Sequence, residues 1–89
     1  MPVYEATFVF PKGNNDMPKV IESYLKVSKA KVKKHDDWGV KALAYPINKQ
    51  KDAHYMYYEL EMETQDVKTL ETKIKLDEVL LRHLIVRLK

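Results

Sequence analysis

The only two arginines of this chain, Arg82 and Arg87, both lie in its last apolar segment. The guanidinium group of arginine is a planar fork that binds a phosphate through two hydrogen bonds, whereas the ammonium group of lysine acts as a point charge. Five lysines are clustered within residues 26–34, and three more follow within residues 41–51. These groups permit a phosphate-bearing partner such as a nucleic acid but do not require one, because a solvated basic surface has the same composition.

The positive charge is unevenly divided along the 89 residues, whose 16 basic and 13 acidic side chains give a net charge of +3. Residues 1–58 contain ten basic and six acidic side chains, whereas residues 59–89 contain six basic and seven acidic ones. The excess of positive charge therefore belongs to the first part of the chain, and the two arginines stand in a segment that is otherwise acidic.

Side chains that commonly perform catalysis or bind metals are few and scattered. The chain has no cysteine, which excludes a thiolate nucleophile, a disulfide and a cysteine zinc site. Its only glycines, Gly13 and Gly39, are too far apart for a phosphate-binding glycine loop. The histidines His35, His54 and His83 lack the spacing of metal ligands. We therefore expect no catalytic residue, no metal site, no cofactor and no small-molecule substrate.

Four segments show the β-branched, aromatic and alternating residues that are typical of strands. The clearest pattern places Tyr55, Tyr57, Glu59 and Glu61 on one face of a strand and apolar residues on the other. The predicted strands cover residues 3–10, 30–47, 53–62 and 79–88, and residues 36–39 interrupt the second strand as a bulge or kink.

Two further segments show helical spacing, each after a residue suited to be an N-cap, Asp16 or Thr64. The first helix is predicted over residues 17–29, with a buried stripe of Val20, Ile21, Tyr24, Leu25 and Val27. The resulting order of elements predicts an α+β, ferredoxin-like fold (split βαβ, βαββαβ), in which two helices cover one face of a four-stranded antiparallel sheet. We expect one such domain over residues 1–89.

The last predicted strand is apolar on both faces, which is unusual for an edge strand. Two helices cover only one face of a sheet, so this strand should lie at the centre of a sandwich or beneath a partner. Tyr55 and Tyr57 fall on the uncovered face, where aromatic side chains either stack on RNA bases or pack against protein. The first strand has no aromatic residue on that face, as an RNA-recognition motif would, so both interpretations stay open.

Several segments resemble the bacterial-type small-subunit ribosomal protein 6 family. The resemblance is carried by Asp37-Trp38-Gly39, by the run Leu43-Ala44-Tyr45-Pro46-Ile47, and by Ala53-His54-Tyr55 after the turn. Tyr4-Glu5 and the run from Leu81 to Arg87 are similar to the first and last strands of that family. These segments occur in the family's order and span nearly the whole chain.

The resemblance implies a structural component of the small ribosomal subunit that binds the central domain of small-subunit ribosomal RNA. It also implies a heterodimer with small-subunit ribosomal protein 18. In that family, basic residues near the N-terminus and on the last strand hold the RNA. The resemblance therefore implies RNA binding by Arg82 and Arg87, extended by Lys89, whereas Pro2 stands near the place of an N-terminal arginine. Lys41 matches a usually basic position before the LAYPI run and completes the predicted RNA-binding residues. We expect the protein partner to contact Tyr45, Tyr55, Tyr57, Leu84 and Val86.

The N-terminus has no cationic start followed by a long apolar run, and no stretch approaches the roughly 20 apolar residues that span a bilayer. We therefore expect no membrane contact and a location in the cytoplasm or inside an organelle, and the resemblance implies that the chain lies on the ribosomes there. Two alternatives to the ribosomal interpretation stay open. One is a stand-alone RNA-binding regulatory module, and the other is a small enzyme acting on acyl phosphates through Lys12, in the loop after the first strand.

Overall fold

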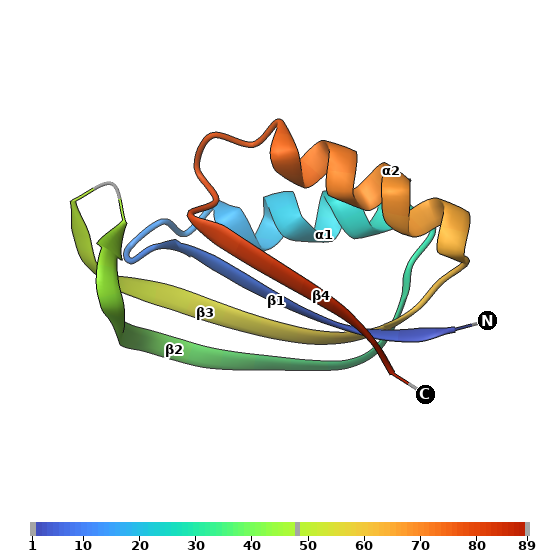
Figure 1. Ribbon diagram of the computed structural model, residues 1–89, viewed down its shortest axis with the longest axis horizontal. Helices are drawn as coiled ribbons and strands as arrows, with labels where there is room; N and C mark the ends of the chain where they lie inside the picture. The colour runs from blue at the N-terminus through green and yellow to red at the C-terminus, as the bar shows by residue number, and fades with distance from the viewer. Residues whose placement is uncertain (1, 48, 89) are drawn as a thin grey trace.

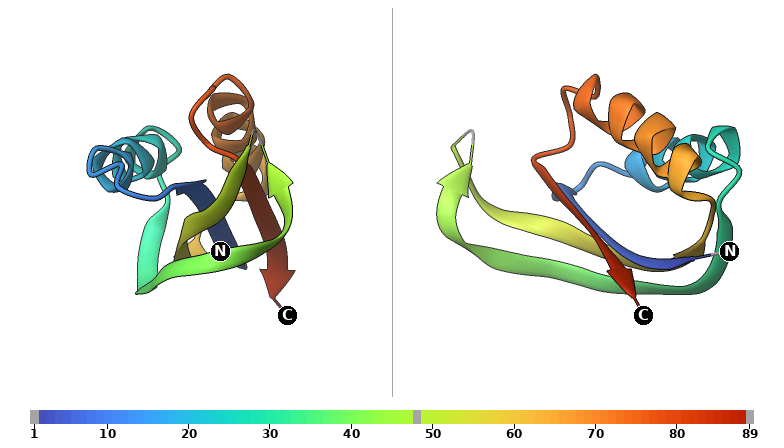
Figure 2. Two further views of the ribbon diagram at one scale, coloured as in Figure 1. Left: turned by 90° about the vertical axis from the view of Figure 1, so that its left-hand side faces the viewer. Right: turned by 45° about the vertical axis from the view of Figure 1, so that its right-hand side comes forward.

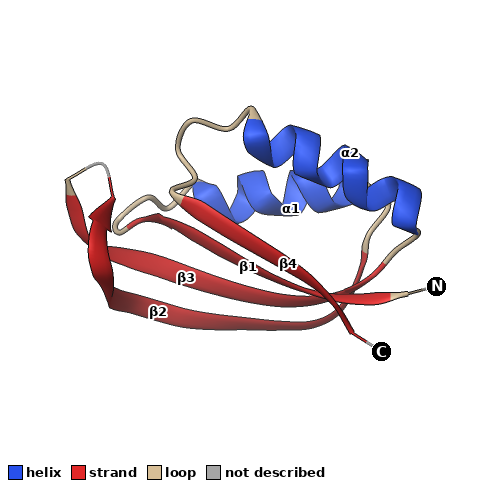
Figure 3. Ribbon diagram, viewed as in Figure 1, coloured by secondary structure: helices blue, strands red, loops and turns tan. Residues whose placement is uncertain are grey.

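The computed structural model describes residues 2–47 and 49–88, and all their side chains except those of residues 44–47 and 50. Its elements follow in the order β1 (Val3–Pro11), α1 (Met17–Val27), β2 (Lys31–Ile47), β3 (Gln50–Glu61), α2 (Thr64–Lys75) and β4 (Arg82–Leu88) (Figure 1). The strands pair antiparallel in the order β2-β3-β1-β4, and both helices lie on one face of the sheet (Figure 3). The predicted ferredoxin-like fold is therefore confirmed.

The hydrophobic core lies between the sheet and the two helices. Alternate residues of β1 and β3 point into it, because successive side chains of a strand face opposite sides of the sheet. The buried residues of β1 and β3 include Tyr4, Ala6, Phe8, Phe10, Met56, Tyr58 and Leu60, and the helices add Met17, Ile21, Leu25, Leu70 and Ile74. The faces predicted for these two strands are thus confirmed.

Helix α1 is shorter than predicted, and its stripe differs at one residue. It ends at Val27, where Lys29 adopts a left-handed φ of 58° and the Ala30 N–H donates to the Leu25 carbonyl at 2.9 Å. This is the geometry of a Schellman C-cap. Val27 is 56% exposed, so its predicted place in the buried stripe is wrong. The side chains that are fully buried recur every four residues, and Val27 does not follow that spacing.

Of the two predicted N-caps, the position of Asp16 is confirmed and that of Thr64 is wrong. Asp16 occupies the N-cap position of α1, but its side chain makes no capping bond, and the Asn14 Oδ1 instead accepts the N–H groups of Asp16 and Met17 at 3.1 and 3.2 Å. Helix α2 begins at Thr64 itself, with Glu63 as its N-cap. Neither helix, at 11 and 12 residues, is long and apolar enough to cross a membrane, a finding that concerns residues 2–47 and 49–88.

Strand β4 starts three residues later than predicted and lies at an edge of the sheet. The Asp77 Oδ1 accepts the N–H groups of Val79 and Leu80 at 2.7 and 3.1 Å, which forms a turn where the sequence predicted strand. The expectation of a central or covered strand is not met within the described chain, because β4 pairs with β1 alone and Leu84 is 60% exposed. An edge strand with an exposed apolar face is a surface that natural proteins usually cover.

Candidate functional site

The face of the sheet that the helices leave uncovered, here called the open face, collects most of the predicted contact residues. Residues directly opposite each other in the strand register share a face. The register aligns three such rows across β4, β1 and β3, namely Arg82, Val9 and Tyr55; Leu84, Thr7 and Tyr57; and Val86, Glu5 and Glu59. Tyr55, Tyr57, Leu84 and Val86, predicted from separate strands, therefore lie on one surface.

A bulge in β2 adds an aromatic side chain to this surface. The strand register shifts between Asp37 and Gly39, so Trp38 is the extra residue. Gly39 adopts a φ of +73°, and its N–H donates to the Asp37 Oδ1 at 2.8 Å. The ring of Trp38 stacks on Tyr57 with 5.0 Å between centroids and an interplanar angle of 9°. The predicted interruption at residues 36–39 is therefore a bulge, and it presents an indole on the open face.

A side-chain contact on the helix side of the sheet fixes the same bulge. The His54 Nε2 lies 2.5 Å from the Asp37 Oδ1. This hydrogen bond lowers the pKa of Asp37 below its usual value, and the hydrogen bond from the Gly39 N–H makes a smaller contribution in the same direction. The carboxylate therefore stays charged at neutral pH and holds the turn that places Trp38.

The ammonium group of Lys41 lies beside the aromatic cluster formed by Trp38, Tyr55 and Tyr57. The Lys41 Nζ lies 4.9 Å from the centroid of Trp38 and 5.9 Å from that of Tyr55. Both distances are within the range of a cation–π interaction. Lys41, predicted as an RNA-binding residue, is thus positioned beside the rings and has its charge at the surface.

A groove of about 360 Å³ lies between this cluster and the first residues of β4. Its apolar lining residues include Val9, Trp38, Leu43, Tyr55 and Leu84, and Arg82 supplies a cation. The hairpin of β2 and β3 extends past the start of β4 and bends toward the helix side of the sheet (Figures 1 and 2). The groove is suited to an apolar side chain next to an anionic group.

The other end of the open face is acidic. Glu5 and Glu59 lie directly opposite each other in the register, an arrangement that repulsion between like charges disfavours. The Tyr57 hydroxyl donates to the Glu5 Oε1 at 2.9 Å and to the Glu59 Oε2 at 3.4 Å, which compensates part of the repulsion. Partial burial of Tyr57, and then its hydrogen bond to Glu5, raise the pKa of this phenol well above its usual value.

The raised pKa of Tyr57 predicts a loss of stability at alkaline pH. A phenol that is harder to ionise in the folded state contributes stability fully below its unfolded pKa of about 10, and this contribution is lost as the pH rises above that value. Thermal unfolding should therefore show a decline in melting temperature from about pH 10 upward, and Tyr57→Phe should make the decline shallower. Identical slopes in the two proteins would contradict the assigned hydrogen bonds.

The chain is similar to known proteins over nearly its whole length. Residues 3–87 match the family model described as Ribosomal protein S6. The chain belongs to the ribosomal protein S6 family. Its fold is also that of the crystal structure of 30S ribosomal protein S6 from Thermotoga maritima, with a TM-score of 0.88 and 18% sequence identity over 98% of this chain and 87% of that chain.

Membership of the S6 family makes the chain a ribosomal protein of the small subunit, and the resemblance read from the sequence is confirmed. The S6 family is one of structural proteins and not of enzymes. Lys12, on which the enzyme alternative rested, forms a surface ion pair with Asp52 at 3.1 Å.

The structure separates the two arginines that the sequence grouped together. Arg82 lies on the open face, whereas Arg87 is opposite Tyr4 and faces the helix side, because the two residues are five positions apart and an odd spacing along a strand places side chains on opposite faces. The side chain of Tyr45 and the whole of Lys89 lie outside the described residues. Of the predicted basic residues that the structure describes, Arg82 and Lys41 share the open face and Arg87 does not.

The contact residues predicted from the sequence do not include Trp38 and Val9, which line the groove of the open face. Trp38 was noted as part of an interruption and of the family resemblance, but it was assigned to no face, because a bulge breaks the alternation from which a face is assigned. The signal available was a large aromatic side chain directly before a glycine inside a strand, which indicates a bulge that re-aims a side chain.

Proposed function

We propose that this S6-family chain, as a single domain of residues 1–89, binds the central domain of small-subunit ribosomal RNA together with small-subunit ribosomal protein 18. The observation that carries this proposal is the open face, which combines exposed apolar side chains with cations on a member of a ribosomal family. The apolar part is suited to protein, and the cationic part is suited to phosphate.

The protein contact is assigned to the apolar strip along β4. Leu84 and Val86 are 60% and 44% exposed, and Trp38, at 43%, lies on the same face. β4 is also the outermost strand of the sheet, so these side chains lie where a partner can reach them. The adjacent carboxylates of Glu5 and Glu59 favour a partner that brings a basic side chain to this end of the strip.

The RNA contact is assigned to the two ends of β4 and to Lys41. Arg82 and Arg87 face opposite sides of the sheet but stand on the same edge strand. Five residues of a strand span about 17 Å, so an RNA backbone that follows this edge would meet both guanidinium groups. Lys41 adds a cation on the open face, and Lys89 continues the same edge in the sequence.

Sedimentation of native lysate tests the proposal. A tagged copy of the chain should comigrate with the small subunit through a high-salt wash, and affinity capture of the free protein should recover protein 18. A tagged ribosomal protein of the large subunit serves as the control for carry-over. A pool of this chain that binds RNA but never enters the subunit would contradict the proposal and favour a stand-alone regulatory module.

A further inference from the structure

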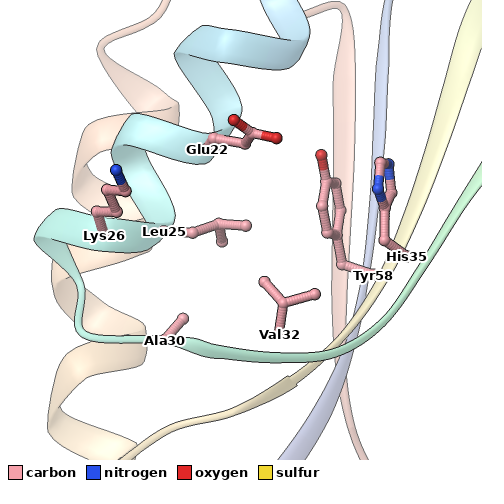
Figure 4. Close-up of a pocket in the computed structure, with 7 residues that line it drawn as sticks. All are labelled: Glu22, Leu25, Lys26, Ala30, Val32, His35 and Tyr58. Carbon is pink, nitrogen blue, oxygen red and sulfur yellow. The ribbon is translucent and has the colours of Figure 1, made fainter.

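A second hollow lies on the helix side of the sheet, away from the open face. It measures about 300 Å³ and opens where the end of α1 approaches β2 (Figure 4). Leu25 and Val32 contribute apolar walls, and Val32 is 46% exposed although it faces the helix side. β2 is an edge strand, so this hollow lies at the opposite edge of the sheet from β4.

Tyr58 brings a buried hydroxyl without a partner to this hollow. The residue is 2% exposed, and its hydroxyl oxygen makes no hydrogen bond within the described structure. His35 stacks on the ring at 4.5 Å between centroids and 2° between planes, and the hydroxyl lies on the side of Glu22 (Figure 4). A buried hydroxyl without a protein partner keeps its donor free for another group, and such a hydroxyl calls for an explanation.

The polar groups of the hollow form a complementary pair. Burial, followed by the nearby charges of Glu22 and Asp37, raises the pKa of Tyr58 to about 12, so the phenol remains a donor at neutral pH. The carboxylate of Glu22 is an acceptor. A ligand that presents a hydrogen-bond acceptor beside an N–H donor would satisfy both groups, and the edge of a nucleobase presents this combination.

The surroundings of the hollow favour RNA over protein as the source of that ligand. Lys26 lines the hollow, and it belongs to the five lysines of residues 26–34. Lys33 and Lys34 are engaged by Glu61 and Asp36 at 3.8 and 3.7 Å, whereas no ion pair is found for Lys26 within the described residues. Cations next to a small apolar hollow suit a base with its phosphate.

We propose that this hollow binds one unpaired nucleobase of the ribosomal RNA. The base lies between Leu25 and Val32, the Tyr58 hydroxyl donates to its carbonyl or ring nitrogen, and Glu22 accepts from its N–H. Lys26 contacts the phosphate of the same nucleotide. This inference rests on the proposed RNA-binding function and adds a second contact, at the opposite edge of the sheet from Arg82.

The test measures affinity for a central-domain fragment of small-subunit ribosomal RNA in the presence of protein 18. Tyr58→Phe removes only the hydroxyl, so RNA affinity should fall about 3- to 10-fold with an unchanged salt slope, as expected for one neutral hydrogen bond. The melting temperature of the free protein should stay the same or rise. Lys26→Ala should instead weaken binding and reduce the slope of log affinity against log salt by about 1.

Tyr24→Phe is the matched control, because the Tyr24 hydroxyl donates to Asp77 and does not line the hollow. It should lower the melting temperature and leave RNA affinity unchanged. Unchanged RNA affinity of Tyr58→Phe, in an assay where Arg82→Ala weakens binding, would overturn the nucleobase site and leave the proposed function intact. A Tyr58→Phe protein that binds RNA normally but protein 18 weakly would also overturn it, in favour of a protein contact. Absence of RNA binding by the wild-type chain would instead contradict the proposed function.

Discussion

Leu84→Asp should lower the affinity of this chain for small-subunit ribosomal protein 18 by about 100-fold or more without unfolding it. Leu84 is 60% exposed in the free chain, so an aspartate there remains hydrated and costs little folding stability. Under the proposed partner the same carboxylate would be buried without a counter-ion. Leaving such a charge unpaired costs about 3–5 kcal/mol, and each 1.4 kcal/mol is about tenfold in affinity.

Val27→Asp is the matched control for this substitution. Val27 is an apolar residue of similar exposure, 56%, but it belongs to α1 and lies away from the open face. Calorimetric titration with protein 18 should give the wild-type affinity for Val27→Asp, and thermal unfolding should show both variants folded. Wild-type affinity in the Leu84→Asp protein would remove β4 from the interface, and an equal loss in both variants would indicate a general effect of charge.

The faces of the two central strands were predictable because a strand alternates with a period of two. That period alone assigns Tyr55 and Tyr57 to the face opposite Met56 and Tyr58, and the observed register confirms it. The same rule applied to Arg82 and Arg87 separates them, although the sequence suggested one phosphate site. The alternation of a strand therefore predicts which face of the sheet each side chain lies on. Two residues of one strand share a face only when they are an even number of positions apart.

Other features depend on contacts that no local pattern contains. Whether β4 lies at the edge or the centre of the sheet depends on which strands pair across the fold, and its apolar character on both faces does not decide this. The side-chain direction of Trp38 depends on a bulge that its register with β3 defines. The unpaired hydroxyl of Tyr58 results from packing between α1 and the sheet, and the sequence predicted only that Tyr58 faces the core.

Replacing the two cationic side chains of the open face, Arg82 and Lys41, with acidic ones should have the largest effect on RNA binding. Arg82→Glu combined with Lys41→Glu should lower affinity for the central-domain RNA by about 100-fold or more and reduce the magnitude of the salt slope by about 2. Each phosphate contact contributes about 0.9 to that slope, and a carboxylate in place of the cation repels the phosphate as well. Filter binding at several salt concentrations measures both quantities.

A double reversal on α2, Lys68→Glu with Lys73→Glu, makes the same change in net charge at exposed positions on the other side of the sheet. The α2 variant should retain most of the affinity and the full salt slope, because these lysines are remote from the proposed contact. Arg87→Glu tests whether the RNA follows the β4 edge or contacts only the open face, since Arg87 faces the helix side. A slope reduced by about 1 supports an RNA backbone along the β4 edge, whereas an unchanged slope contradicts that path and confines the contact to the open face.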